Sequence, residues 1–217
     1  MNSAIIVSGG LGTRFGGDTP KQFIKINGQE ILSFSVKTFL NHPQIDEVII
    51  VSPKKWRKHV ISQYPECHVV LGGKRRQDSS LNGVMATSDK STNVLIHDAV
   101  RPFISSQIIS KCLSALKTFD ASAPIIPSIE SMVKWNGKKA DFIDRAEIQI
   151  VQTPQCFKKH TIIDILKSNF QGTDEIGMLL KFHPNSKIKL IDGNIDNIKI
   201  TSQNDMKYFS KSNINGS

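Results

Sequence analysis

The chain has 217 residues, of which 39% are hydrophobic and 22% charged, and its formal net charge is +9. This composition excludes a disordered chain, and the length predicts one domain of generous size. The three cysteines, Cys67, Cys112 and Cys156, are far apart and form no CxxC pair, so we expect neither a disulfide framework nor a zinc site. No signal peptide is recognisable, and no apolar run approaches the roughly 18 residues that cross a bilayer. We therefore expect a cytoplasmic protein that contacts no membrane.

Short β-branched runs alternate with segments of helical periodicity in the first 127 residues. Strands are expected at residues 4–7, 47–51, 68–71, 93–96 and 123–126. Helices are expected near residues 54–63, 78–88 and 105–117, and one face of a further helix carries Leu32, Val36, Phe39 and Leu40. Apolar strands that alternate with helices predict an α/β fold, in which a Rossmann-like, mainly parallel sheet is covered by helices on both faces.

The alternation stops after residue 127. An Asn-Gly pair at residues 136–137 lies between short runs of strand character, which is typical of a β-hairpin. We expect an arm that projects from the sheet at about residues 128–152, within a single domain of residues 1–217. Beyond the arm we expect helices near 159–168 and 174–182, strands at 188–191 and 197–200, and a last helix from about Asn204.

A glycine-rich segment, SGGLGTRFGG at residues 8–17, follows the first strand directly. Glycines allow backbone N–H groups to approach a phosphate closely. The segment contains neither the P-loop sequence nor the complete dinucleotide-binding fingerprint. It carries Arg14 and is followed by Lys21, and two cations beside such a turn favour a triphosphate site. An ordinary strand-to-helix turn with solvated cations is the alternative.

Two more polar clusters follow the third and fourth strands. GGKRRQDS at residues 72–79 combines glycines, cations and a helix start, where α/β proteins usually bind nucleotides; a basic surface turn is the alternative. In HDAVRPF at residues 97–103, Asp98 is well placed to meet Mg²⁺ or a ribose hydroxyl, unless it only caps the next turn. We expect His97 to be structural, because no second His or Cys lies near it.

The positive charge suits anionic partners in general. Nucleic acid is disfavoured because the chain has no recognition-helix signature. The basic residues on both sides of Trp56, at residues 54–58, are more simply a solvated helix face. We therefore expect no nucleic-acid partner, and phosphorylated metabolites remain open as anionic partners.

Taken together, the clusters resemble the 2-C-methyl-D-erythritol 4-phosphate cytidylyltransferase family. The matching segments occur in the family's order from residue 4 to about residue 206, and they are GGLGTRF, PKQF, GGKRRQDS, HDAVRPF, DRAEIQIVQTPQCF and DNIKIT. The resemblance implies that CTP and a polyol phosphate give a CDP-polyol and pyrophosphate. The acceptor phosphate would attack the α-phosphorus in line with Mg²⁺ as cofactor, a reaction that depends on positioning and charge neutralisation.

The resemblance also implies roles for individual residues. The transferring phosphate would be stabilised by Arg14, Lys21 and Lys199. CTP would be bound by Gly9, Gly10, Gly12, Gly73, Ser79 and Asp98. Asp98 is also the candidate metal ligand. The acceptor would be contacted by Ser131, Arg145 and Thr153. The family further implies a homodimer in which the arms exchange, so that Arg145 serves the site of the other subunit.

Because the sequence departs from the family pattern at some positions, two acceptor substrates remain candidates. Residues 8–10 read Ser-Gly-Gly where the methylerythritol enzymes usually have Ala-Ala-Gly, and the sister enzymes for ribitol 5-phosphate favour a second glycine there. The arm reads Glu-Ser-Met at 130–132 instead of a form close to Asp-Thr-Ile, but Ser131 keeps the hydroxyl. The short chain and Thr-Asp-Glu at 173–175 favour methylerythritol phosphate, which we prefer. A non-catalytic nucleotide-binding protein is disfavoured, because all three cations of the family pattern are present.

Overall fold

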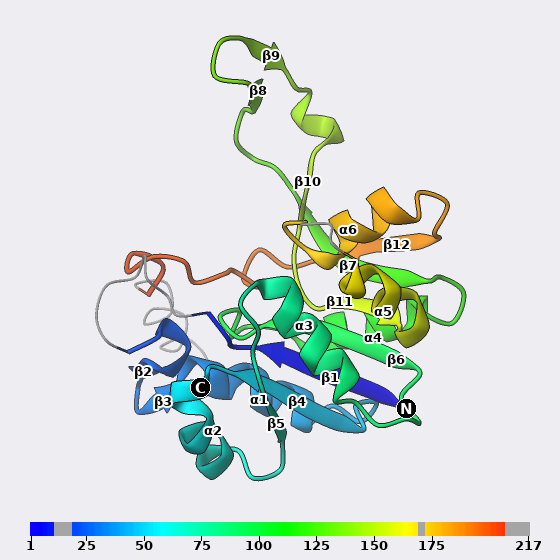
Figure 1. The fold of residues 1–217 in the computed structure, drawn as a ribbon. Helices are drawn as coiled ribbons and strands as arrows, with labels where there is room; N and C mark the ends of the chain where they lie inside the picture. Colours follow the sequence, from blue (N-terminus) through cyan, green and yellow to red (C-terminus); the bar gives the residue numbers. More distant parts are fainter. Residues whose placement is uncertain (11–18, 169–171, 207–217) are drawn as a thin grey trace.

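The structure is a computed structural model that describes residues 1–10, 19–168 and 172–206. Two residues predicted in the site, Gly12 and Arg14, lie outside the described residues. Figure 1 shows a central sheet with helices on both faces and a long arm that extends away from it. The predicted α/β, Rossmann-like fold class is confirmed.

The described residues contain an eight-stranded sheet. Its strands are β1 (Asn2–Val7), β4 (Glu47–Ser52), β5 (His68–Leu71), β6 (Asn93–Asp98), β7 (Ala121–Pro127), β10 (Gln149–Val151), β11 (Gln155–Lys158) and β12 (Ile188–Asp192). The order across the sheet is β10-β7-β11-β6-β1-β4-β5, and β12 pairs with β7. β1 pairs in parallel with β4 and β6, and β4 pairs in parallel with β5. The carboxyl ends of these four strands therefore meet at one edge, where α/β proteins bind ligands.

Helices cover both faces of this sheet. They are α1 (Ile31–Leu40), α2 (Arg57–Gln63), α3 (Arg76–Met85), α4 (Ser106–Ala115), α5 (Lys159–Lys167) and α6 (Glu175–Phe182), with 3₁₀ turns η1 (Lys21–Phe23), η2 (Lys54–Trp56) and η3 (Arg145–Glu147). Consecutive residues of a strand point to opposite faces. Ile6 shares a buried cluster with Leu32 of α1, whereas Ile5 shares another with Val84 of α3 and Ile165 of α5. Both faces are apolar, and this explains why the parallel strands show no polar alternation.

Two hairpins carry Asn-Gly turns. The sequence analysis missed the small one, which joins β2 (Lys25–Ile26) to β3 (Gln29–Glu30) through Asn27 and Gly28, both with positive φ angles of 51° and 79°. These angles are those that a tight hairpin turn requires. The predicted one joins β8 (Val133–Trp135) to β9 (Ala140–Phe142) in the arm, and there Gly137 has a φ of 93°.

Some predictions for the second half of the chain are wrong. The strand predicted at residues 197–200 does not form, because this segment crosses the strand ends and is held by single bonds, such as that from Ile200 N to the Val100 carbonyl. β10 and β11 were missed, and both pair antiparallel to their neighbours. Leu40 is 38% exposed because it is the last residue of α1. Of the last predicted helix, only the start at Asp205 lies within the described residues.

Candidate active site

A cavity of about 660 Å³ lies at the carboxyl ends of the parallel strands. Its walls come from residues 7–10 at the end of β1, from residues 73–76 and Ser79 in the turn before α3 and its first helical turn, and from residues 98–100 at the end of β6. Lys21 of η1 and two residues of the C-terminal segment, Lys199 and Thr201, complete the lining. A cavity of this size and place is typical of a ligand site in an α/β protein.

The cavity brings together most of the residues that the sequence predicted. Those that line it are Gly9, Gly10, Lys21, Gly73, Ser79, Asp98 and Lys199. Thr153 is buried beneath it, and its Oγ1 accepts a hydrogen bond from Asp98 N at 3.2 Å. Ser131 and Arg145 lie on the arm and do not line the cavity. Their roles toward the acceptor stay predictions.

One wall of the cavity is made by the turn before α3. Ser79 Oγ accepts from Gly73 N at 3.0 Å and donates to the Arg75 carbonyl at 3.2 Å, so the serine closes the turn on itself. Gly73 has no room for a side chain, because a Cβ there would overlap the Cβ of Asp78. Glycine at this position therefore lets the turn pack closely against the start of α3 at the wall of the cavity.

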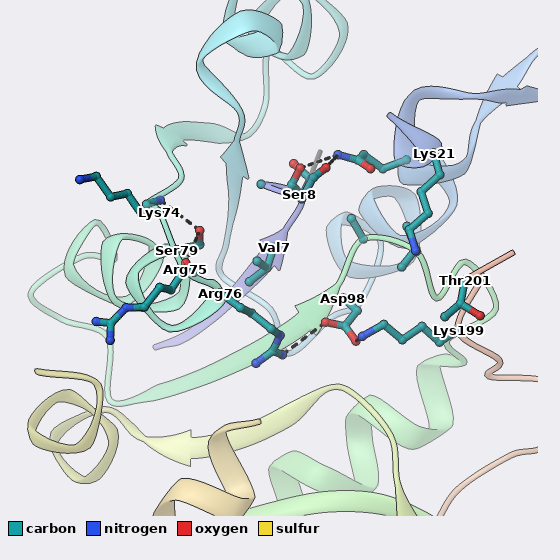
Figure 2. Close-up of a pocket in the computed structure, with 16 residues that line it drawn as sticks. Val7, Ser8, Lys21, Lys74, Arg75, Arg76, Ser79, Asp98, Lys199 and Thr201 are labelled. Carbon is teal, nitrogen blue, oxygen red and sulfur yellow. Dashed lines mark hydrogen bonds and ion pairs between the residues drawn. The ribbon is translucent and has the colours of Figure 1, made fainter. Parts of the chain in front are cut away.

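Asp98 is the acidic centre of the site. Its carboxylate lies 2.8 Å from Lys199 Nζ, 3.3 Å from Arg76 Nη2 and 3.7 Å from Arg101 Nε. Burial alone would raise the pKa of Asp98, but the attraction of Arg76, Lys199 and Arg101 outweighs it and holds this pKa well below its usual range. Asp98 is therefore ionised at neutral pH, and Figure 2 shows it between Arg76 of α3 and Lys199 of the C-terminal segment.

The sequence analysis missed Arg76 and Glu175. Arg76 Nη1 lies 2.6 Å from both carboxylate oxygens of Glu175, which is only 1% exposed. Ser80 Oγ donates a further hydrogen bond of 2.6 Å to the same carboxylate. Burial acts to lower the pKa of Arg76, but Glu175 and Asp98 raise it above its ordinary value. The one available signal was helical spacing, which places Arg76 and Ser80 on the same side of α3.

His97 supports the site from below, as the sequence analysis expected. It is fully buried, with Nε2 at 3.1 Å from the Arg101 carbonyl and Nδ1 at 3.0 Å from Thr153 Oγ1. Burial lowers the pKa of His97 to about 4. The ring is therefore neutral at pH 7, and because a carbonyl can only accept, Nε2 carries the proton. Nδ1 then accepts from Thr153, whose oxygen in turn accepts from Asp98 N.

The C-terminal segment carries Lys199 across the strand ends. Asn197 Nδ2 donates to the Thr153 carbonyl at 2.8 Å, and the Asn197 carbonyl accepts from Arg101 Nη1 at 2.7 Å. Lys21 Nζ donates to the Ile200 carbonyl at 2.7 Å. These contacts place the side chains of Lys21 and Lys199 at the same end of the cavity, near Asp98 (Figure 2).

The donor set of the cavity fits a divalent metal that arrives with a nucleotide. Within the described ranges, no cluster of three or more His, Cys, Asp or Glu side chains would hold a metal ion alone. Among the described residues, Asp98 is the single carboxylate that lines the cavity. Mg²⁺ is usually bound through one or two carboxylates together with substrate phosphates, and one carboxylate beside a triphosphate pocket meets this need.

No helix in the described part of the chain is long and apolar enough to span a bilayer.

Known proteins are similar to this chain in both sequence and fold. The model of the 2-C-methyl-D-erythritol 4-phosphate cytidylyltransferase family matches residues 2–210. The enzyme of that name from Clostridium novyi (strain NT) is 35% identical over 94% of this chain and 93% of its own length. The crystal structure of 4-diphosphocytidyl-2C-methyl-D-erythritol synthase from Anaerococcus prevotii DSM 20548 gives a TM-score of 0.87 at 28% identity, over 98% of this chain and 96% of that one.

A relative that is named for CDP-ribitol is about as similar in sequence. The bifunctional ribulose 5-phosphate reductase/CDP-ribitol pyrophosphorylase of Haemophilus influenzae is 36% identical over 94% of this chain. This chain covers 46% of that protein, so it spans about half of its length. The family match, the relatives and the cation-lined cavity agree on the reaction class. The chain belongs to the 2-C-methyl-D-erythritol 4-phosphate cytidylyltransferase family and is a CTP-dependent nucleotidyltransferase.

Proposed function

We propose that this protein transfers CMP from CTP to 2-C-methyl-D-erythritol 4-phosphate, giving CDP-methylerythritol and pyrophosphate. The observation that carries the proposal is the pairing, in one cavity, of glycine turns with the cations Lys21 and Lys199 beside Asp98. Glycine turns expose backbone N–H groups to phosphates, and fixed cations stabilise the charge of a phosphoryl group in transfer. The family match favours the methylerythritol acceptor.

The chain's residues act mainly by positioning charge. The acceptor phosphate is itself the nucleophile and carries negative charge at neutral pH, so no side chain has to remove a proton. Lys199 is held in place by Asp98 at 2.8 Å, and Lys21 by the Ile200 carbonyl at 2.7 Å. Both ammonium groups are therefore oriented before the substrates bind, which lowers the reorganisation that the transfer requires.

We assign the family's divalent metal as Mg²⁺, with Asp98 as its ligand from this chain. A bound Mg²⁺ supplies neutralisation of the triphosphate charge. Asp98 suits this role because it lines the cavity and is ionised. CTP and Mg²⁺ are both present in the cytoplasm, and we propose that the reaction takes place in that compartment.

The arm favours a homodimer. Val133 and Trp135 alternate with Lys134, so they share one face of the hairpin, and Phe142 pairs opposite Val133. These apolar side chains are 61%, 61% and 85% exposed. An exposed apolar face of this kind marks an interaction surface. A second copy that covers it would bring Arg145 and Ser131 to the site of its neighbour, as the family pattern implies.

Ribitol 5-phosphate is the second candidate acceptor. The Haemophilus relative is named as a CDP-ribitol pyrophosphorylase, and residues 8–10 follow the glycine pattern of such enzymes. The decisive experiment measures pyrophosphate release with CTP and Mg²⁺ in three parallel reactions, which contain methylerythritol phosphate, ribitol 5-phosphate or no acceptor. We expect turnover with methylerythritol phosphate alone. A clear preference for ribitol 5-phosphate would replace the proposed acceptor, and release without acceptor would contradict transfer altogether.

A further inference from the structure

Gln22 connects the glycine loop to the turn that carries Lys21. Its side chain is 2% exposed, and Nε2 donates to the Ser8 carbonyl at 2.6 Å and to the Gly10 carbonyl at 2.9 Å. A carboxamide has two N–H groups on this nitrogen, and both are therefore used on the backbone of the loop.

The turn that holds Gln22 is rigidly attached to the rest of the protein. η1 is a single 3₁₀ turn, in which Phe23 N donates to the Pro20 carbonyl at 2.9 Å and Ile24 N to the Lys21 carbonyl at 3.1 Å. Phe23 is 3% exposed, and its ring stacks on that of Trp56 at a centroid distance of 4.4 Å. Lys21 and Gln22 therefore belong to the same short hydrogen-bonded turn.

The two hydrogen bonds also orient the peptide groups of the loop. In a trans peptide the C=O and the following N–H point in opposite directions. The Ser8 carbonyl is held toward Gln22, so the N–H of Gly9 points away from Gln22. Ser8 N in turn donates to the Val51 carbonyl at 2.9 Å, which ties the start of the loop to the end of β4. Gly9 and Gly10 both line the cavity.

We propose that Gln22 is a positioning residue, which sets the direction of the Gly9 amide and the spacing of residues 8–10 from Lys21. The proposal rests on the transfer reaction proposed above, since it assumes that loop and lysine hold the same triphosphate. Gln22 itself does not touch the reacting atoms. It acts through the backbone at residues 8–10 on one side and through Lys21 on the other.

The first test is Gln22→Met, which keeps the side-chain length and removes both donors. We expect CTP to bind about tenfold more weakly in equilibrium titration and kcat/KM for CTP to fall about 100-fold, the order of loss that a misplacement near 1 Å causes. The KM for the acceptor stays unchanged. Gln77→Met is the matched control, because Gln77 is also buried and its Nε2 donates to two carbonyls, of Leu166 and Ser168, but it does not line the cavity.

The second test is Gln22→Glu, whose carboxylate turns two donors into acceptors that face two carbonyl oxygens. A buried carboxyl in this place takes up a proton as the pH falls, and its O–H can then donate to one carbonyl. We expect the ratio of the variant's rate to the wild-type rate to rise as the pH decreases from about 8 to about 6. A side chain that only fills space would give a constant ratio.

The outcomes separate the two proposals. A wild type that turns over neither acceptor counts against the proposed function, while CTP titration of Gln22→Met against Gln77→Met still decides the role of Gln22. Equal CTP affinity and turnover in these two variants, or a rate ratio for Gln22→Glu that does not change with pH, would overturn the positioning role. If neither Gln22 variant folds while Gln77→Met does, Gln22 is a core residue and the inference fails.

Discussion

Arg76 and Glu175 are 99 residues apart in the chain, yet Arg76 Nη1 lies 2.6 Å from each oxygen of the Glu175 carboxylate. The same guanidinium reaches Asp98 with its other terminal nitrogen, at 3.3 Å. Arg76 therefore joins the first residue of α6 to the acidic centre of the cavity. The position of Asp98 depends in part on an ion pair whose carboxylate, that of Glu175, is buried and does not line the cavity.

Glu175→Gln should destabilise the fold. The change leaves Arg76 without its closest anion, and loss of one partner of a buried ion pair costs about 3 kcal/mol, near the low end of the known range because the Arg76 side chain is 31% exposed. Urea unfolding measures this loss. Glu66→Gln, at an exposed position, is the control and should leave the free energy of unfolding unchanged. Equal stabilities of the two variants would contradict a structural role for the pair.

Lys21→Ala and Lys199→Ala should each lower kcat by about 100- to 1,000-fold, the range found when one charge-stabilising donor is removed. Both proteins should remain folded by circular dichroism, since each lysine lies at the cavity and outside the buried apolar clusters. Lys189→Ala is the matched control, because Lys189 is an exposed lysine on β12. Pyrophosphate release is the assay, and near-normal rates would remove these lysines from the mechanism.

Acid should destabilise the protein through His97. Its pKa of about 4 in the native state lies below the value of about 6.5 for an unfolded histidine. Between these values the unfolded chain binds a proton that the native state does not, so stability is lost as the pH falls. From about pH 7.5 to pH 5 this amounts to about 2 kcal/mol in urea unfolding. His97→Asn should remove that part of the pH dependence, whereas His68→Asn, at an exposed position, should retain it.

Gly73→Ala should disturb the turn before α3. The added methyl group would overlap the Cβ of Asp78, and relief of such overpacking typically costs about 1 to 3 kcal/mol. We expect a lower melting temperature together with weaker CTP binding, because Gly73 N also orients Ser79. Gly10→Ala serves as the control for stability, since a Cβ there meets no atom of the described residues within 4 Å. A melting temperature equal to that of Gly10→Ala would show that the turn can relax.

The apolar face of the arm should determine the oligomeric state. Trp135→Glu places a charge on the proposed dimer surface, and we expect a monomer in light scattering with turnover lost because Arg145 no longer reaches a second site. Lys134→Glu changes the opposite face of the same strand and should remain dimeric. A Trp135→Glu protein that is still a dimer would mean that the arm is not the main contact.

The parallel part of the fold was predictable because its strands are buried on both faces. A continuous apolar run such as residues 48–51 is stable only where both faces of the strand are covered, and the helices between such strands follow from periodicity. The short strand β11 was not predictable in the same way. It pairs antiparallel with both β6 and β7, so its direction depends on the path of the arm before it, and no local pattern encodes that path.

Site residues could be predicted where they lie at or near the end of a strand. Asp98 is the last residue of the buried strand β6 and Gly73 lies two residues after β5, and their residue types match what such positions bind. The role of Arg76 could not be assigned from the sequence, because it depends on an ion pair with Glu175 from a distant segment. Lys199 was found by resemblance, while its backbone was predicted wrongly as a strand. A segment held by single hydrogen bonds has no periodic signature.

The late position of Lys199 in the chain has a consequence for biosynthesis. A nascent polypeptide that ends after β11 already contains β1, β4 and β6, together with Asp98 and Lys21. It does not yet contain Lys199, nor the Ile200 carbonyl that holds Lys21. Such a chain can pair its parallel strands on the ribosome before it is able to catalyse. Enzyme activity therefore requires that the segment at residues 197–201 lies across the ends of strands that were synthesised before it.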